Sequence, residues 1–184
     1  AALKEAAADM SGDIPDLKTL QRAFDQLEQR YDEKYGGFTK APKFPTPHNL
    51  TFLLRYWLRT GNARALQIVE KTLHEMRCGG IYDHVGFGFH RYATDQTWLV
   101  PHFEKMLYDQ ALIAMAYIEA YQVTGKKLYA QTVHEIAAYV LRTMTSHVGG
   151  FFCGQDADSE GREGKFYLWT EDEIRNALRP DEAE

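Results

Sequence analysis

Residues 46–80 read TPHNLTFLLRYWLRTGNARALQIVEKTLHEMRCGG and contain two helices of different character. A helix start is predicted at 46–47, with Thr46 as the N-cap and with Pro47 at the first helical position, where Pro is favoured. The helix body, 50–58, is apolar almost all round, which predicts burial on most sides. After a tight junction at 60–62, the second helix has a single apolar stripe, made of Leu66, Val69, Leu73 and Met76. The stretch therefore predicts an inner and an outer helix of a layered all-α fold.

The same alternation extends on both sides of this helix pair. Amphipathic helices are predicted over 16–31 and over about 126–147, and a densely apolar helix is predicted over 101–124. A short β-hairpin is expected near 151–169, with strands over 151–157 and 165–169, and Thr170 with Glu173 predicts a capping box for a last short helix. The order amphipathic, buried, amphipathic, buried, amphipathic is typical of an α/α-hairpin array.

The connections between these helices alternate in length as well. Gly61 and Gly125 mark very short turns, whereas the connections 36–46, 79–101 and 149–169 are long and each contains a double glycine. In an antiparallel array, all of the long connections fall on one face. The pattern therefore predicts that any site lies on that face, where the unusual loop residues gather.

Composition limits the function classes. The chain has 184 residues, 45% hydrophobic and 26% charged, with a net charge of −5, which suits one globular domain. We assign 1–15 to a linker or arm and 16–184 to the domain. The mild acidity argues against nucleic-acid binding, and no apolar run reaches the roughly 20 residues of a membrane span. Two cysteines indicate reduced thiols and a cytoplasmic location, and the missing initial Met indicates a segment of a longer chain.

Aromatic residues are unusually frequent, at 13% of the chain with 11 Tyr, 10 Phe and 3 Trp. Some of these rings lie on predicted helix stripes and belong to the core. The others concentrate in two long connections, 81–103 and 151–169. Rings around a few convergent polar groups are typical of a small-molecule site.

The first of these connections carries most of the candidate acid–base residues. His84, His90 and His102 are candidates because imidazole titrates near neutrality, and Glu104 follows at the predicted helix start. The alternative for a loop His is a local hydrogen bond, and the alternative for Glu104 is charge complement to the helix dipole. Asp109, on an otherwise apolar helix, needs a partner if it is buried, so a structural pair and a site role both remain open.

The second connection contains the acidic run 155–161, QDADSEG. Asp156 and Asp158 are either acid–base groups or turn caps. The run is similar to the first half of a calcium loop, but Tyr167 stands where the bidentate Glu is required, so we expect no metal site. The stretch 86–91 fails the dinucleotide fingerprint because Arg91 replaces a required Gly, and we expect no cofactor.

Several stretches together form a specific set of motifs: 31–45 (YDEKYGGFTKAPKFP), 79–84 (GGIYDH), 88–92 (GFHRY), Trp98, 101–109 (PHFEKMLYD), 156–159 (DADS) and 166–170 (FYLWT). On these residues the chain, from about residue 16 onward, resembles the spermatogenesis-associated thioredoxin-domain family. The resemblance implies an (α/α)6 toroid similar to six-hairpin glycosidases and N-acylglucosamine 2-epimerases. Five or six helices are about half of such a toroid.

The resemblance also implies a function and partners. The expected function is that of a carbohydrate-active enzyme, a sugar epimerase or a glycoside hydrolase, using the His and carboxylate residues above. The alternative is a non-catalytic scaffold or client-binding module for an attached thioredoxin-like domain. We expect contacts with that domain and with the remaining toroid half, and self-association of the isolated segment. The predicted substrate contacts, with Trp98, Tyr82 and Tyr108 as sugar platforms, are Lys43, Tyr82, Asp83, Arg91, Trp98, Lys105, Tyr108 and Asp109.

Overall fold

The computed structural model describes residues 16–179 and 181–182, so the predicted arm 1–15 lies outside the described residues. The described part is mostly helical, which confirms the predicted all-α class. The helices are α2 (Leu17–Arg30), α3 (Pro47–Thr60), α4 (Ala63–Cys78), α5 (Leu107–Thr124), α6 (Lys127–Tyr139), a π-helical turn over Val140–Met144, and α7 (Glu171–Ala177). The Thr170–Glu173 capping box is present at the start of α7.

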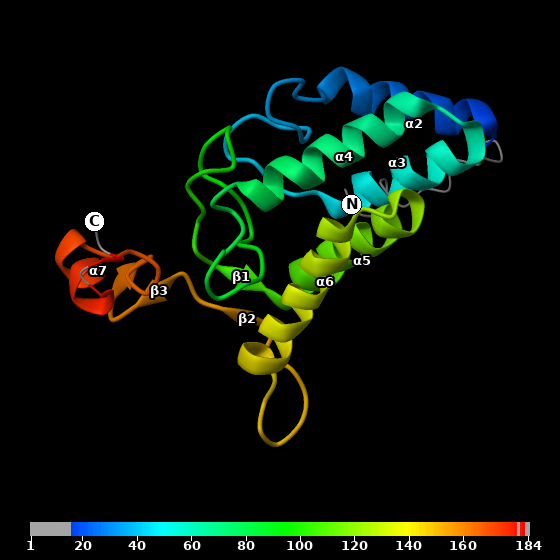
Figure 1. Cartoon of the computed structure of the whole chain (residues 1–184). Helices are drawn as coiled ribbons and strands as arrows, with labels where there is room; N and C mark the ends of the chain where they lie inside the picture. The colour runs from blue at the N-terminus through cyan, green and yellow to red at the C-terminus, as the bar shows by residue number, and fades with distance from the viewer. Residues whose placement is uncertain (1–15, 180, 183–184) are drawn as a thin grey trace, which may run out of the picture.

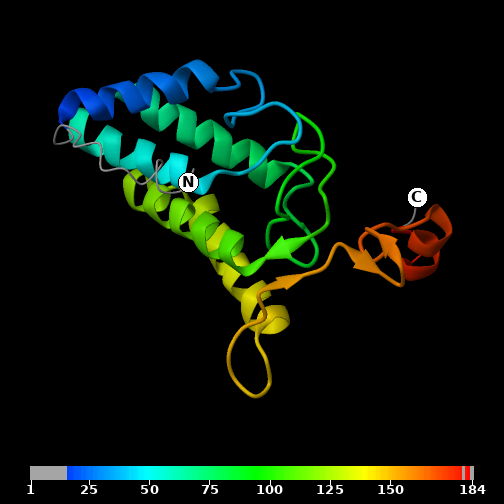
Figure 2. The same cartoon turned by 180° about the vertical axis from the view of Figure 1, so that it is seen from behind.

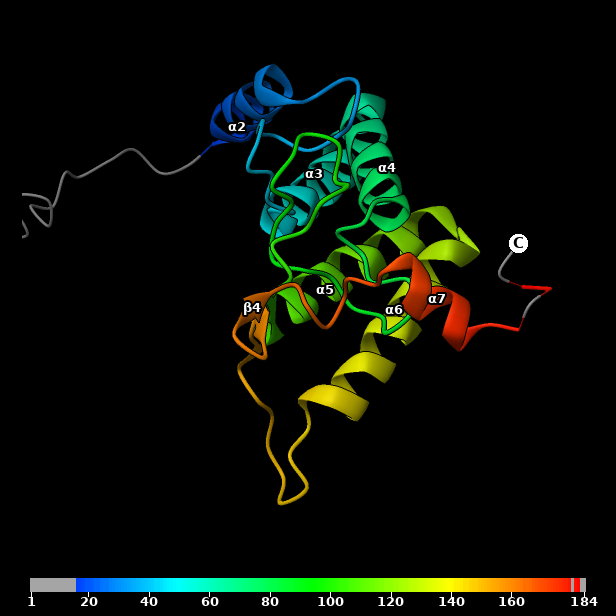
Figure 3. The ribbon, with the colours of Figure 1, turned by 90° about the vertical axis from the view of Figure 1, so that its left-hand side faces the viewer.

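The helices form α/α-hairpins, as predicted. Helix α4 packs beside α3, α6 packs beside α5, and α3 and α5 contact each other (Figures 1 and 3). The short turns of the two hairpins lie at one end of the helices and the long connections gather at the other (Figure 2). Backbone pairing joins these connections, because Lys43 bridges to Ala93 and Lys105 pairs with Gln155. The predicted common face for the long connections is therefore confirmed.

The boundaries of the first hairpin follow from local chemistry. Helix α3 starts at Pro47 as expected, but Thr46 has a left-handed backbone with φ of 43° and its hydroxyl caps nothing. The side-chain cap predicted for Thr46 is therefore wrong. Gly61 ends α3 with φ of 72°, and the Asn62 carboxamide accepts the amide hydrogen bonds of the next helix start.

The helix predicted over 101–124 begins six residues later, at Leu107. Residues 102–104, just before this helix, pair with residues 91–92 of the 79–101 connection. Arg91 N donates to Glu104 O at 2.8 Å and His102 N donates to Tyr92 O at 3.0 Å. Strand β1 (Lys105–Met106) then pairs with β2 (Gly154–Gln155). Backbone pairing between distant segments takes the place of the predicted helix at these residues. Glu104 therefore does not lie in the first turn of a helix, and that prediction is wrong.

The β-hairpin near 151–169 is present but smaller than predicted. It consists of β3 (Asp158–Ser159) and β4 (Arg162–Glu163), and Lys165–Trp169 is not a strand. The third amphipathic helix also stops earlier than predicted, with its π-helical turn ending at Met144. Within the described residues, no helix has the length and apolar character needed to cross a membrane.

The double glycine at 79–80 stands at the end of α4, and Gly79 is the C-cap of that helix, with its N–H donating to Glu75 O. Neither residue has a positive φ. Instead, the 98–99 backbone passes so close that a Cβ on Gly80 would lie 2.0 Å from Leu99 O, and one on Gly79 would lie 2.5 Å from Trp98 O. These glycines allow two parts of the long connection to touch, which seals Trp98 in the core at 0% exposure.

Replacing Gly80 with Ala is therefore expected to destabilise the fold by about 2–3 kcal/mol, because backbone has to move to admit the methyl group. Chemical denaturation measures the loss. Gly125→Ala is the control, since a Cβ there meets nothing and only the backbone strain at φ of 67° remains. That strain costs roughly 1 kcal/mol. Equal losses in the two variants would contradict the close approach at Gly80.

Candidate functional site

Two paired segments, 89–92 and 102–105, form a wall between the helices and the last connection. Side chains alternate across it. His90, Phe103 and Lys105 are on one side, where they contact Tyr167. Arg91 and Glu104 are on the other side, next to the start of α5.

The helix side of this wall lines an open cleft of about 330 Å³. Its lining comes from the start of α3, from Arg91 and from the first turns of α5. The lining residues are Phe44, Pro45, Thr46, Pro47, His48, Arg91, Tyr108, Asp109 and Leu112. Three of the predicted substrate contacts, Arg91, Tyr108 and Asp109, therefore meet in one concave site.

Asp109 is a buried titratable group in the lining of this cleft. Its side chain is only 8% exposed, and Oδ2 has no hydrogen-bond partner. Burial raises the pKa of Asp109 to about 6, the Arg91 guanidinium opposes that rise and the Glu104 carboxylate adds to it. A carboxyl group that titrates near neutrality is suited to giving and taking protons at physiological pH.

Arg91 and Glu104 form the charged rim of the cleft. Arg91 Nη1 donates to Glu104 Oε2 at 2.8 Å, and this pair raises the pKa of Arg91. The Glu104 side chain is 26% exposed and already engaged. The sequence predicts Glu104 as a catalytic candidate. In the structure its carboxylate holds Arg91 and helps to raise the pKa of Asp109.

A row of rings continues from the cleft across the same face. Phe44 lies 4.8 Å from Tyr92, and Tyr92 stacks on His102 with centroids 4.6 Å apart and planes at 13°. His102 Nδ1 is 3.0 Å from Glu163 Oε1. Phe44, Tyr92 and His48 were not among the predicted site residues. The concentration of rings in the long connections is the sequence signal that points to the first two.

Two of the residues predicted as sugar platforms lie in the core. Trp98 is fully buried and its indole N–H donates to Tyr35 O at 2.8 Å. Tyr82 is 1% exposed and its hydroxyl donates to Glu135 at 2.5 Å. Both rings pack against other side chains, so the predicted platform role is wrong for these two residues, while Tyr108 stays exposed at the cleft.

Two predicted lysine contacts are buried ion pairs. Lys43 Nζ donates to Asp32 at 2.8 Å and Lys105 Nζ donates to Asp83 at 2.7 Å, and both lysines are almost fully buried. The bonds from Lys43 and Gln96 hold the pKa of Asp32 far below its usual range against burial. These lysines and Asp83 tie the long connections together and do not reach the cleft.

The remaining candidates lie apart from Asp109. His84 is exposed and contacts Arg77 Nη1 at 3.3 Å and Gly79 O at 3.1 Å. His90 is buried on the far side of the wall. The Asp156 carboxylate accepts from Asp158 N at 3.1 Å, which is the turn-capping alternative. Among the described residues, no group of three or more His, Cys, Asp or Glu side chains is arranged to hold a metal ion.

Comparison with known proteins identifies close relatives by sequence. No protein-family model matches the chain. Spermatogenesis-associated protein 20 of human is 49% identical over 167 residues, and its mouse counterpart is 48% identical over the same length. Each alignment covers 85% of this chain and 21% of the relative. The chain thus spans about a fifth of the length of these curated relatives.

Comparison of structures shows the fold. The cellobiose 2-epimerase of Bacillus thermoamylovorans superposes with a TM-score of 0.66 at 14% identity, covering 76% of this chain and 40% of the epimerase. An unsaturated glucuronyl hydrolase specific for heparin superposes with a TM-score of 0.63 at 16% identity, covering 80% and 44%. The helical hairpins are therefore those of a six-hairpin toroid. With the sequence identities above, the chain belongs to the spermatogenesis-associated protein 20 family and corresponds to part of its toroid.

Proposed function

We propose that the Asp109 cleft is a carbohydrate site and that Asp109 is its general acid–base residue. The observation that carries the proposal is a buried carboxyl group without a partner, with its pKa raised to about 6, in an open cleft beside an arginine. Sugar epimerisation and glycoside hydrolysis both need a group that exchanges protons with carbon or oxygen near neutral pH.

The surroundings of Asp109 support a polyhydroxylated ligand. Arg91 offers several N–H donors in a planar fork, and the Tyr108 ring is exposed beside it. The ring row that starts at Phe44 provides flat apolar surface next to these polar groups. Sugars present hydroxyl edges and apolar C–H faces, so they match such a mixed surface.

Titration with sugars, followed by amide NMR of the 184-residue chain, tests this proposal. Cellobiose and mannose are expected to give saturable shifts at Arg91, Tyr108 and Leu112. Asp109→Asn is expected to weaken binding by at least about tenfold, the loss of a charge-assisted hydrogen bond. Asp172→Asn, on the exposed surface of α7, serves as the control. Absence of saturable shifts with a wider sugar panel, or equal affinity in Asp109→Asn, would contradict the proposal.

The second candidate function is a scaffold or client-binding module for a thioredoxin-like domain. Its support is the apolar side chains exposed along α5, namely Leu112, Met115 and Ile118. Such a stripe suits packing against a protein, whether the rest of the toroid, the attached domain or a second copy. Met115→Lys distinguishes the two candidates. If this stripe is a protein-binding surface, the variant is expected to lose concentration-dependent association in sedimentation analysis. If the Asp109 cleft is a carbohydrate site, the variant is expected to keep its sugar binding.

We also propose a cytoplasmic location for the protein. Cys78 and Cys153 are both free and exposed, which suits a reducing compartment.

A further inference from the structure

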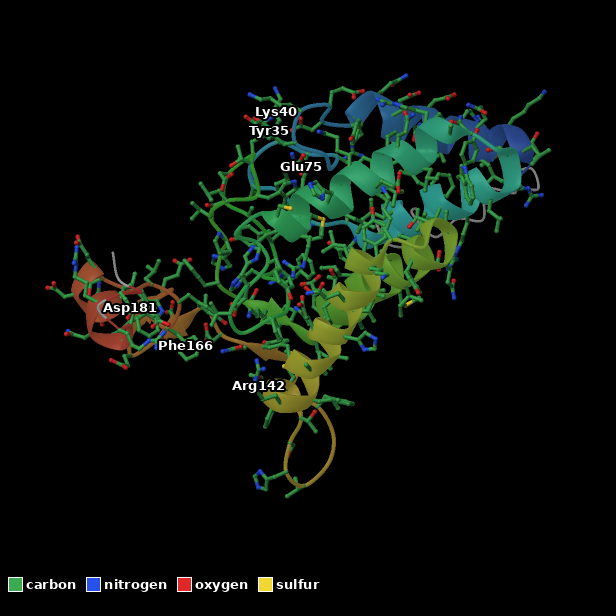
Figure 4. All side chains as sticks on the ribbon, in the orientation of Figure 1. Tyr35, Lys40, Glu75, Arg142, Phe166 and Asp181 are labelled. Atoms are coloured by element: carbon green, nitrogen blue, oxygen red, sulfur yellow. The ribbon has the colours of Figure 1, made fainter. Side chains whose placement is uncertain are left out.

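A second hollow, of about 350 Å³, lies between α2 and α3, and we call it the α3 hollow. The two helices contact each other on the side of the molecule away from the labelled Asp181 (Figure 4). Phe52, Arg55 and Arg59 form much of the wall that α3 contributes. Both arginine side chains are exposed, so a ligand in the hollow can reach them.

The α3 hollow is next to the Asp109 cleft. His48, in the first turn of α3, lines both of them. The spacing of His48, Arg55 and Arg59 places these side chains along one face of the helix. At a rise of about 1.5 Å per residue, this face extends roughly 16 Å from His48 to Arg59. A ligand that occupies both the cleft and the hollow is therefore longer than one sugar ring.

The face of α3 that lines the hollow is cationic. Helix α3 contains Arg55 and Arg59 but no Asp or Glu, although the chain as a whole has a net charge of −5. Side chains four residues apart on a helix are neighbours, and like charges at that spacing repel each other. An anion bound beside the two guanidinium groups relieves this repulsion. The hollow therefore favours an anionic ligand.

The charge available to such a ligand is about one unit. Arg55 Nη2 donates to Glu119 Oε1 of α5 at 2.6 Å, so the charge of Arg55 is largely balanced, and its side chain is still 66% exposed. Arg59 forms no ion pair with any residue that the structure describes. A single free positive charge matches a carboxylate better than a phosphate group, which carries nearly two negative charges at pH 7.

We propose that the α3 hollow is a subsite for the carboxylate of an acidic sugar, and that the ligand of the Asp109 cleft is an oligosaccharide that contains this unit. The inference rests on the function proposed above and narrows the class of its substrate. Arg59 binds the carboxylate, and Arg55 contributes the N–H groups that Glu119 leaves free, because a guanidinium matches the geometry of a carboxylate. The half-buried Phe52 provides apolar contact for the acidic ring.

Two disaccharides test the subsite: cellobiose, and cellobiouronic acid, in which a carboxylate replaces one hydroxymethyl group. Amide NMR titrations of the 184-residue chain are made at low salt, because salt screens exposed charges. The acid is expected to bind at least about fivefold more tightly than cellobiose, and to shift Phe52 and Arg59 in addition to Leu112. Arg59→Gln is expected to remove most of this advantage and to leave the affinity for cellobiose unchanged.

Two further variants separate a specific subsite from general attraction between charges. Arg175→Gln removes an exposed arginine of α7 and is the matched control, which is expected to change neither affinity. Glu119→Gln removes the counter-ion of Arg55. It is expected to strengthen binding of the acid and to leave binding of cellobiose unchanged, an effect that a purely structural role of the arginines does not produce.

The proposal is overturned if the acid binds no more tightly than cellobiose, or if Arg59→Gln lowers its affinity no more than Arg175→Gln does. Either result, obtained together with saturable cellobiose shifts at Leu112, overturns the subsite and leaves the function proposed for the Asp109 cleft in place. Absence of saturable shifts with both disaccharides overturns the subsite and also counts against that proposed function.

Discussion

Replacing Lys105 with Ala is expected to lower the free energy of unfolding by about 3–5 kcal/mol. The Lys105 ammonium is 1% exposed and donates to Asp83 Oδ2 at 2.7 Å and to Phe87 O at 2.8 Å. It also lies 4.5 Å from the centre of the Tyr139 ring. Its removal leaves the Asp83 carboxylate buried without its counter-ion and disconnects β1 from the 83–87 loop. Denaturation by urea measures the loss.

Two variants show whether the loss comes from the uncompensated charge. Lys71→Ala breaks an exposed pair with Glu75 on α4 and is expected to cost less than about 0.5 kcal/mol. Asp83→Asn in the Lys105→Ala background neutralises the stranded carboxylate and is expected to recover part of the stability. If Lys105→Ala costs no more than Lys71→Ala, the buried pair does not hold the long connections together.

Asp109→Asn is expected to stabilise the protein at high pH by up to about 3 kcal/mol. The pKa of Asp109 is about 6 in the folded chain against an ordinary value of 3.8. Between these values the folded state binds more protons than the unfolded state, so the stability that Asp109 contributes falls as pH rises from about 4 to 6. Above that window the carboxylate is charged, buried and without a partner at Oδ2.

Denaturation of both proteins at pH 4 and pH 8 measures this effect. The variant is expected to be more stable than the wild type at pH 8, and the difference is expected to shrink towards pH 4, where Asp109 is protonated. Other titrating groups are common to both proteins and cancel. A difference that is independent of pH, or a wild type that is the more stable at pH 8, would show that Asp109 has a charged partner in the fold. Active sites often contain groups that lower the stability of the fold because their function needs them.

The helical array was predictable from local pattern, and the wall beside Asp109 was not. Residues 46–80 carry the spacing of an inner and an outer helix, and the structure has α3 and α4 there. Residues 101–106, PHFEKM, begin with Pro and lead directly into the apolar α5 segment, so the local pattern predicts helix there. They pair instead with a segment about ten to twenty residues earlier and with β2, and such contacts leave no periodic signal.

The candidate site was also only partly predictable from the sequence. Asp109 was open to a structural or a functional role because an acid on an apolar helix is conspicuous in sequence. Its partner-free Oδ2 depends on where Arg91 and Glu104 point, which only the paired segments determine. The rings of Trp98 and Tyr82 are similar to those of Tyr92 in sequence context. Close backbone approach at Gly79 and Gly80 buries the first, and neighbouring side chains cover the second.

The acid–base role proposed for Asp109 requires that its carboxyl group titrate near neutrality in the folded chain. Titration of side-chain carboxyl groups by carbon NMR, with Asp109→Asn to assign the resonance, tests it most directly. We expect a midpoint of about 6 for Asp109. A midpoint at or below the ordinary 3.8 would contradict it, because the carboxylate would then be stabilised in the fold and unsuited to proton transfer at neutral pH.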